Sequence, residues 1–82
     1  MNIIVYTKTG CPWCIGVTTM LAENNISFEE RNVTDNQDYM DEMIKISDQS
    51  KAPTLIIDGE VIADSDKDEV RKKLENKGIV LK

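Results

Sequence analysis

A strand that runs directly into a helix carrying two cysteines is the feature that most constrains this chain. Residues 2–7 are an apolar run rich in β-branched side chains, which predicts a strand buried on both faces. The tetrapeptide Cys-Pro-Trp-Cys at 11–14 follows it. Proline just inside a helix start is tolerated because its missing N–H has no helical partner there. The spacing therefore predicts a helix over 12–25 with a Cys-x-x-Cys pair at its N-terminus.

The middle of the chain predicts one more strand and one more helix. Residues 27–33 are short and mostly charged, which favours a strand at a sheet edge. Apolar side chains then recur at helical spacing up to Ser47, with Asp35 as the expected N-cap.

The last third of the chain predicts a hairpin and a final helix. Strands over 54–57 and 60–63 flank an Asp-Gly pair, a spacer typical of a type I′ turn. The first of these strands is apolar without alternation, so we expect it to be central. The helix should be capped by Asp64 or Ser65 and end near Lys77, before a glycine.

These elements predict an α/β fold in one domain spanning residues 1–82, in the order β-α-β-α-β-β-α. The first β-α-β should form a right-handed parallel unit. The hairpin should add two antiparallel strands. The result is a mixed four-stranded sheet with helices on both faces.

Charge and composition exclude several classes of function. The chain has 10 basic and 15 acidic residues, a net charge of −5 and no histidine. Nucleic acids and anionic membranes are therefore disfavoured as partners, because neither would find a basic surface. The commonest metal ligand is missing, and we predict no metal site. Neither a signal peptide nor a membrane span is evident, which predicts a cytoplasmic protein whose thiols are kept reduced.

The position of the two cysteines predicts different roles for them. Cys11 falls beside the unpaired N–H groups and the positive dipole end of the helix, which favour a thiolate. Lys8 could add a positive charge nearby. Cys14 is one turn further into the helix and should keep a higher pKa. We expect Cys11 to be the nucleophile and Cys14 the resolving thiol, a chemistry that needs no separate base.

Three other interpretations of the cysteine pair are weaker. A zinc site needs four ligands, and two cysteines without histidine provide half of them. A structural disulfide would close too short a loop to stabilise much, and it is unexpected in a reducing compartment. Two buried cysteines could also be three residues apart by chance. The position directly after a strand favours redox chemistry.

The sequence resembles the glutaredoxin family of the thioredoxin superfamily over nearly its whole length. The matching segments are residues 6–8, Tyr-Thr-Lys; 11–14, Cys-Pro-Trp-Cys; 52–54, Ala-Pro-Thr; 57–62, Ile-Asp-Gly-Glu-Val-Ile; and 65–66, Ser-Asp. The family motif is usually Cys-Pro-Tyr-Cys, so Trp13 is a substitution within the aromatic class. The resemblance implies a thioredoxin-like fold in its compact glutaredoxin form.

The resemblance also implies a glutathione-dependent thiol–disulfide oxidoreductase. Glutathione would be a co-substrate rather than a permanently bound cofactor, and its mixed disulfide with Cys11 the central intermediate. Pro53 matches the family's cis-proline, although it could instead be a trans turn-breaker. The main chain of Ala52 would then pair with the cysteinyl backbone of glutathione.

The remaining contacts with glutathione are also implied by the resemblance. Ser65 and Asp66 match the positions that bind the γ-glutamyl end, although they could simply cap a helix. Lys8 suits the glycine carboxylate, although an exposed lysine is more often solvated. Trp13 should form the rim of a substrate groove.

Three departures from the family weaken glutathione as the obligatory partner. Residues 51–52 are Lys-Ala where the family has Thr-Val, and residues 63–64 are Ala-Asp where it has two glycines. Met40 stands where the second helix commonly offers glutamine or arginine to the glycine carboxylate. Lys45 or Lys51 could substitute for it.

Three functions remain open from the sequence. The first is a monomeric dithiol glutaredoxin that reduces protein disulfides or glutathionylated proteins. The second is a redoxin that donates electrons to ribonucleotide reductase and is reduced by a thioredoxin-reductase-type flavoenzyme. The third is a dimeric iron–sulfur scaffold that uses Cys11 of two chains with glutathione. Pro12 disfavours the third.

Overall fold

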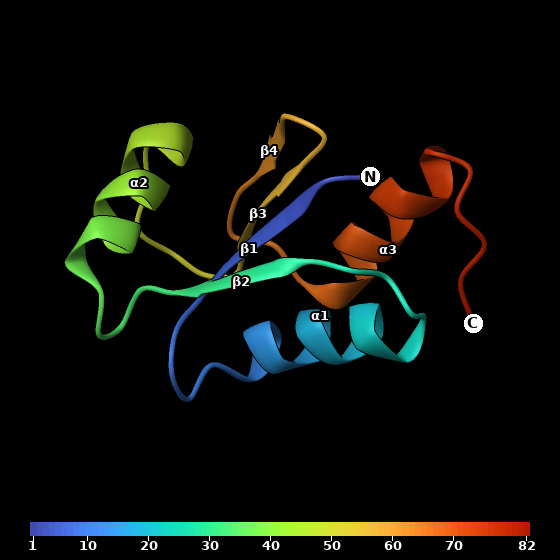
Figure 1. The fold of residues 1–82 in the computed structure, drawn as a ribbon, viewed down its shortest axis with the longest axis horizontal. Coiled ribbons are helices and arrows are strands. Elements are labelled where there is room, and N and C mark those ends of the chain that lie inside the picture. Colours follow the sequence, from blue (N-terminus) through green and yellow to red (C-terminus); the bar gives the residue numbers. More distant parts are fainter.

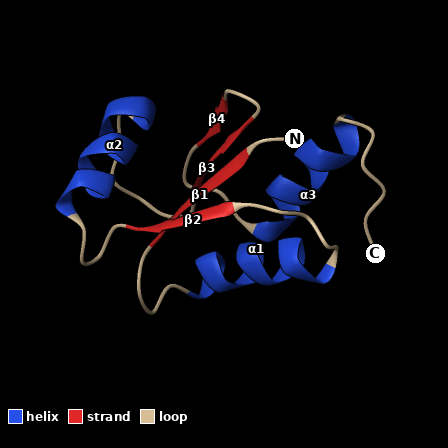
Figure 2. Ribbon diagram, in the orientation of Figure 1, coloured by secondary structure: helices blue, strands red, loops and turns tan.

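The computed structural model describes residues 1–82 and has the predicted element order (Figures 1 and 2). The elements are β1 (Ile3–Thr7), α1 (Pro12–Glu23), β2 (Glu29–Asn32), α2 (Gln37–Ser47), β3 (Thr54–Ile57), β4 (Glu60–Ile62) and α3 (Lys67–Asn76). None of the three helices has the length and apolar content needed to cross a bilayer.

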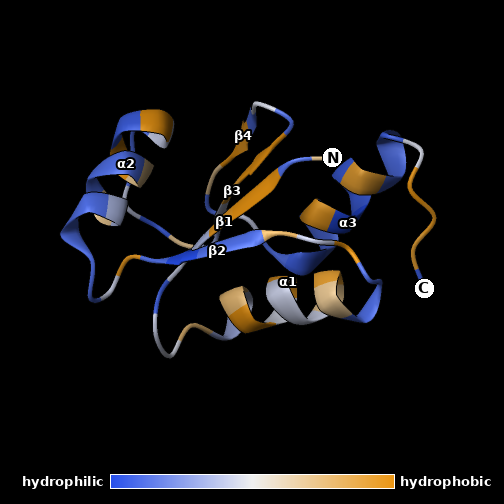
Figure 3. Cartoon of the chain, viewed as in Figure 1, coloured by the Kyte–Doolittle hydropathy of each residue, from blue (hydrophilic) through white to orange (hydrophobic).

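The four strands form one mixed sheet in the order β2-β1-β3-β4. β1 pairs with β2 in parallel, while β1 with β3 and β3 with β4 are antiparallel. The prediction of β2 as an edge strand and β3 as a central strand is confirmed. Apolar residues concentrate on β1 and β3, whereas β2 is hydrophilic along its length (Figure 3).

Helices cover both faces of the sheet, as predicted: α1 and α3 lie on one side and α2 on the other (Figure 1). The larger core, between the sheet and the α1–α3 layer, contains ten buried residues, among them Val5, Leu21 and Leu74. A smaller cluster under α2 contains Tyr6, Val33 and Met43. Successive side chains of a strand point to opposite faces, so the single strand β1 serves both cores.

The turn between β3 and β4 is the predicted hairpin. Asp58 has a φ of 49° and Gly59 a φ of 86°, the two positive values of a type I′ turn. The carboxylate of Asp58 also accepts the N–H of Asn2 at 2.8 Å. This hydrogen bond ties the turn to the start of the chain.

The predicted cap of α2 is wrong by one residue. Asn36 is the N-cap, and its Oδ1 accepts the N–H of Tyr39 at 3.2 Å. Asp35 and Asn36 are equally good capping residues, so their identity could not decide between them.

The cap of α3 is also a correction. Asp66, not Asp64 or Ser65, is the N-cap, and its Oδ1 accepts the N–H of Glu69 at 2.8 Å. The N–H of Ser65 donates to the carbonyl of Pro53 at 2.9 Å. That bond holds the segment against the start of β3, so the helix begins later.

The end of α1 differs from the prediction as well. The helix ends at Glu23 rather than near residue 25, because Asn25 adopts a left-handed φ of 57°.

Candidate active site

Cys11 caps the helix that it precedes. Its Sγ accepts the N–H of Cys14 at 3.2 Å, the position that a serine or aspartate oxygen occupies in an ordinary N-cap. Both cysteines are free thiols. Cys11 is partly exposed, whereas Cys14 is only 3 % exposed. A main-chain donor therefore holds the sulfur that solvent can reach.

Burial gives Cys14 the higher pKa that its place in the helix predicted. Its pKa is raised from 9.0 to about 12, first by removal from water and then by its hydrogen bond with Cys11. The charge of Glu30 acts in the same direction, and the N–H of Lys8 acts against it. Cys14 is therefore a protonated thiol at neutral pH.

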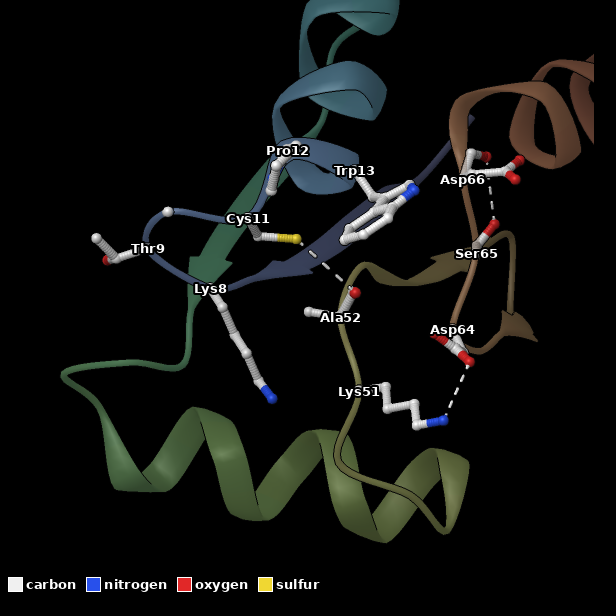
Figure 4. A pocket seen from close by; sticks show the side chains of 11 residues that line it. Lys8, Thr9, Cys11, Pro12, Trp13, Lys51, Ala52, Asp64, Ser65 and Asp66 are labelled. Carbon is white, nitrogen blue, oxygen red and sulfur yellow. Dashed lines mark hydrogen bonds and ion pairs between the residues drawn. The ribbon is translucent and has the colours of Figure 1, made fainter.

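The loop before β3 faces the exposed sulfur. The Ala52–Pro53 peptide bond is cis, as the resemblance implied. The thiol of Cys11 is directed at the carbonyl of Ala52, 3.9 Å away (Figure 4). Pro53 itself is buried. The backbone of residue 52 thus lies at the sulfur, where a substrate main chain could pair with it.

A glutamine that the sequence did not single out holds this loop in place. Gln49 donates from Nε2 to Ser47 Oγ at 2.8 Å and to Thr54 Oγ1 at 2.9 Å. Its Oε1 accepts the N–H of Lys51 at 2.7 Å. The hydroxyl of Thr54, which is fully buried, donates to the carbonyl of Lys51 at 2.8 Å. The network therefore fixes Lys51 before residue 52 and Thr54 after it.

The opposite wall of the site is the segment before α3. Ser65 is 5 % exposed, and Asp66 caps the helix through one carboxylate oxygen. Asp64 has a positive φ of 49° and faces Lys51, with 3.7 Å between Oδ2 and Nζ (Figure 4). This ion pair joins the two walls at the mouth of the site, a feature that the sequence did not predict.

These segments enclose a groove of about 510 Å³ around Cys11. It is lined by Lys8, Thr9, Gly10, Cys11, Pro12, Trp13, Lys51, Ala52, Asp64, Ser65 and Asp66. Six of the eight residues predicted for the site line this groove. The other two, Cys14 and Pro53, are buried. Side chains from distant parts of the chain therefore meet at one sulfur.

The cations of the groove are partly engaged. Lys8 donates from Nζ to the carbonyl of Ser50 at 2.7 Å, which leaves two of its three donors for a ligand. Of the two lysines considered as substitutes at the glycine carboxylate, Lys51 lines the groove and Lys45 does not. Trp13 is 64 % exposed and stands at the groove's edge, where the sequence placed it.

Comparison with known families identifies the fold and its chemistry. The model of the glutaredoxin family matches residues 3–62, which include the two cysteines and the cis-proline. The chain belongs to the glutaredoxin family. Members of this family are thiol–disulfide oxidoreductases, and so is this protein.

Two curated members of the family are similar over most of the chain. A glutaredoxin-like 8.6 kDa protein encoded in the rubredoxin operon of Clostridium pasteurianum is 37 % identical over 73 residues, which cover 89 % of this chain and 97 % of that protein. Glutaredoxin 3 of Escherichia coli K12 is 34 % identical over 65 residues, covering 79 % of this chain and 78 % of that one.

Two solved structures share the fold. A thioredoxin-like protein superposes with a TM-score of 0.78 at 33 % identity, over 85 % of this chain and 96 % of that chain. The complex of buckwheat glutaredoxin with glutathione superposes with a TM-score of 0.71 at 19 % identity, over 92 % of this glutaredoxin and 69 % of that chain.

Proposed function

We propose that this glutaredoxin reduces protein disulfides and glutathionylated proteins with electrons from glutathione, and that Cys11 is its nucleophile. The observation that carries the proposal is the 3.2 Å hydrogen bond from the N–H of Cys14 to Cys11 Sγ, inside a groove that solvent can enter. That bond fixes the sulfur at the surface of the groove, and disulfide exchange requires a sulfur that a substrate disulfide can reach.

The reaction has two displacements. The Cys11 thiolate attacks one sulfur of the substrate disulfide, and the other sulfur leaves as a thiolate with the bonding electron pair. Cys14 then gives up its proton and attacks Cys11 Sγ, which releases the first sulfur of the substrate. The substrate has gained two electrons, its two thiolates take one proton released by Cys14 and one from solvent, and the two cysteines are joined as a disulfide.

Two molecules of glutathione would return the protein to its reduced form. The first attacks Cys11 and frees Cys14, giving a glutathione mixed disulfide. The second attacks the sulfur of the bound glutathione, giving glutathione disulfide and the Cys11 thiolate. Both electrons come from the two glutathione thiols, and no bound cofactor is required.

Several groups in the groove could hold glutathione. The main chain of Ala52 lies beside the reactive sulfur, and the second carboxylate oxygen of Asp66 suits an ammonium group. Lys8 and Lys51 suit a carboxylate. The buckwheat relative of the same fold binds glutathione, which supports this assignment.

The test is a titration of the oxidised protein with glutathione, followed by mass spectrometry. The Cys14→Ser variant cannot form the internal disulfide, so it is treated with glutathione disulfide instead. We expect it to accumulate a species heavier by one glutathione, because its resolving thiol is missing. The Cys11→Ser variant should form no such species and should reduce no disulfide. Activity retained by Cys11→Ser would contradict the proposal.

A second electron donor is favoured by one observation, the Lys51–Asp64 ion pair. It engages Lys51, one of the two lysines that line the groove, and places a carboxylate where an anionic tripeptide would bind. A thioredoxin-reductase-type flavoenzyme would not need that subsite. Such a protein would act as a cytoplasmic donor to enzymes such as ribonucleotide reductase. Reduction of the oxidised protein by NADPH and this flavoenzyme, but not by glutathione, would establish this alternative.

A further inference from the structure

A second groove begins where the active-site groove ends and runs between α1 and α3. Its first hollow, about 330 Å³, shares Pro12, Trp13 and Asp66 with the active-site groove. Its second hollow, about 470 Å³, shares Pro12, Gly16 and Lys67 with the first. The hollows therefore form one path that leads away from Cys11 along α1.

Two large apolar side chains stand along this path. Trp13 lines both the active-site groove and the first hollow and is 64 % exposed. Figure 4 shows its ring extending from α1 toward the segment at Ser65 and Asp66. Ile15 lines the second hollow and is 61 % exposed. The two side chains line different hollows, Trp13 the one nearer Cys11 and Ile15 the one farther along α1, so each offers an apolar contact to a different part of a bound segment.

Gly16 of α1 lines both hollows and has no side chain to fill them. Glycine inside a helix lowers stability relative to alanine. The packing of this structure does not require it, because an added Cβ would meet only the side chain of Lys67, at 3.8 Å and 4.0 Å. The missing side chain instead keeps the space between the two helices open.

The charges along the second hollow are balanced. Two cations, Lys67 and Arg71, and two anions, Glu23 and Asp68, line it, although the whole chain carries a net charge of −5. None of these four residues forms an ion pair within the chain. A strongly charged occupant would gain little on such a surface. An uncharged segment with an apolar side chain suits it better.

We propose that this path binds the residues next to the target cysteine of a substrate protein, as an extended, uncharged segment with apolar side chains against Trp13 in the first hollow and Ile15 in the second. The inference rests on the proposed attack of Cys11 on protein disulfides. A substrate chain whose cysteine reaches Cys11 Sγ must leave the active-site groove at one end, and Trp13 forms the wall shared with the path. Residues on one side of the target cysteine would therefore enter it.

The test uses peptides whose single cysteine carries a thionitrobenzoate label. The Cys11 thiolate attacks the peptide sulfur, the bond to the label breaks, and the label leaves as a coloured thiolate with the electron pair. One peptide has about four uncharged residues on each side of the cysteine, including one leucine on each side. At roughly 3.3 Å per residue, an extended chain of this length reaches from Cys11 into the path. Two shorter peptides lack the residues on one side or the other. Rates are measured with the reduced protein in single turnover.

The path predicts that only one of the two truncations slows the reaction. We define the rate ratio as the rate with the long peptide divided by the rate with the truncated peptide that reacts more slowly. This ratio should fall about tenfold in the Gly16→Gln variant, because the glutamine side chain fills the path at Gly16. The control variant Ala22→Gln places the same side chain at an exposed position of α1 outside the path and should keep the wild-type ratio.

A milder variant separates binding from damage to the fold. Gly16→Ala should raise the midpoint of thermal unfolding, because alanine favours the helix, and should still lower the rate ratio. An unchanged ratio in Gly16→Gln, or an equal effect of the two truncations, would overturn the path. A wild-type protein that releases the label from none of the peptides would contradict the oxidoreductase chemistry itself.

Discussion

The protonation of Cys14 gives a quantitative prediction for its reactivity. A pKa of about 12 in place of 9.0 lowers the fraction of thiolate about a thousandfold at any pH below 9. We expect the alkylation rate of Cys14 by iodoacetamide, measured in the Cys11→Ser variant, to rise about tenfold per pH unit from pH 7 through pH 10. The serine hydroxyl keeps a hydrogen-bonding atom at the position of Cys11 Sγ.

The slope of this profile separates protonation from access. Burial alone would slow alkylation by a constant factor, and the rate would then level off near pH 9, as for an ordinary thiol. Mass spectrometry of the alkylated protein measures the rate, and the same measurement in denaturant supplies the reference. A plateau near pH 9 in the folded variant would refute the idea that burial suppresses ionisation of Cys14.

The same shift predicts how stability depends on pH. The folded state holds the Cys14 proton more tightly than the unfolded state, so this contribution is fully present below pH 9 and is lost as the pH rises toward 12. Between these values the free energy of unfolding should fall by about 1.4 kcal/mol per pH unit more steeply than in the Cys14→Ala variant. Urea unfolding of both proteins from pH 8 to pH 11 tests the sign, and parallel profiles would contradict it.

Three substitutions test the rest of the structure. Gln49→Ala should lower the free energy of unfolding by about 1–3 kcal/mol in urea, because it removes a hydrogen bond to the buried hydroxyl of Thr54 and two more that fix the loop, whereas the exposed Gln37→Ala control should cost less than about 0.5 kcal/mol. Asp64→Asn should free Lys51 and raise the rate of reduction by glutathione about threefold at low salt; an unchanged rate would argue against an anionic donor in the groove. Leu21→Ala, at a fully buried position, should cost about 2–5 kcal/mol, and a smaller loss would mean that α1 packs loosely.

The sequence predicted the helices and strands because they depend on local patterns. Apolar runs mark β1 and β3, and the Cys-Pro-x-Cys spacing marks the start of a helix. Cys11 precedes α1 as the spacing predicted, and the Ala52–Pro53 bond is cis as the family resemblance implied. The errors lie at the helix ends, where two neighbouring residues can cap equally well.

Contacts between distant residues could not be predicted in this way. The Lys51–Asp64 pair joins two loops that only the sheet brings together. Gln49 lies in a polar stretch that reads as an ordinary loop, and its role depends on the buried hydroxyl of Thr54. Arg31 links β2 to α2 through Glu42 at 2.7 Å in the same manner. Each of these contacts depends on tertiary geometry that no single-sequence pattern encodes.

The raised pKa of Cys14 does not prevent it from resolving a mixed disulfide, because it is held beside its target. At pH 7 a pKa of about 12 leaves a thiolate fraction of about 10⁻⁵. An effective molarity of about 10⁵ M for a well-oriented intramolecular reaction still gives the equivalent of about 1 M reactive thiolate. A millimolar external thiol of ordinary pKa provides only about 10⁻⁵ M. The N–H of Cys14 is hydrogen-bonded to the sulfur that its thiolate must attack. We therefore expect Cys14 to release the substrate from Cys11 faster than glutathione does, wherever the substrate leaves room for Cys14 to move. Glutathione should resolve a mixed disulfide with a substrate protein only when Cys14 is replaced, whereas the return of the oxidised protein to its dithiol form still ends with a second glutathione attacking the glutathione bound to Cys11.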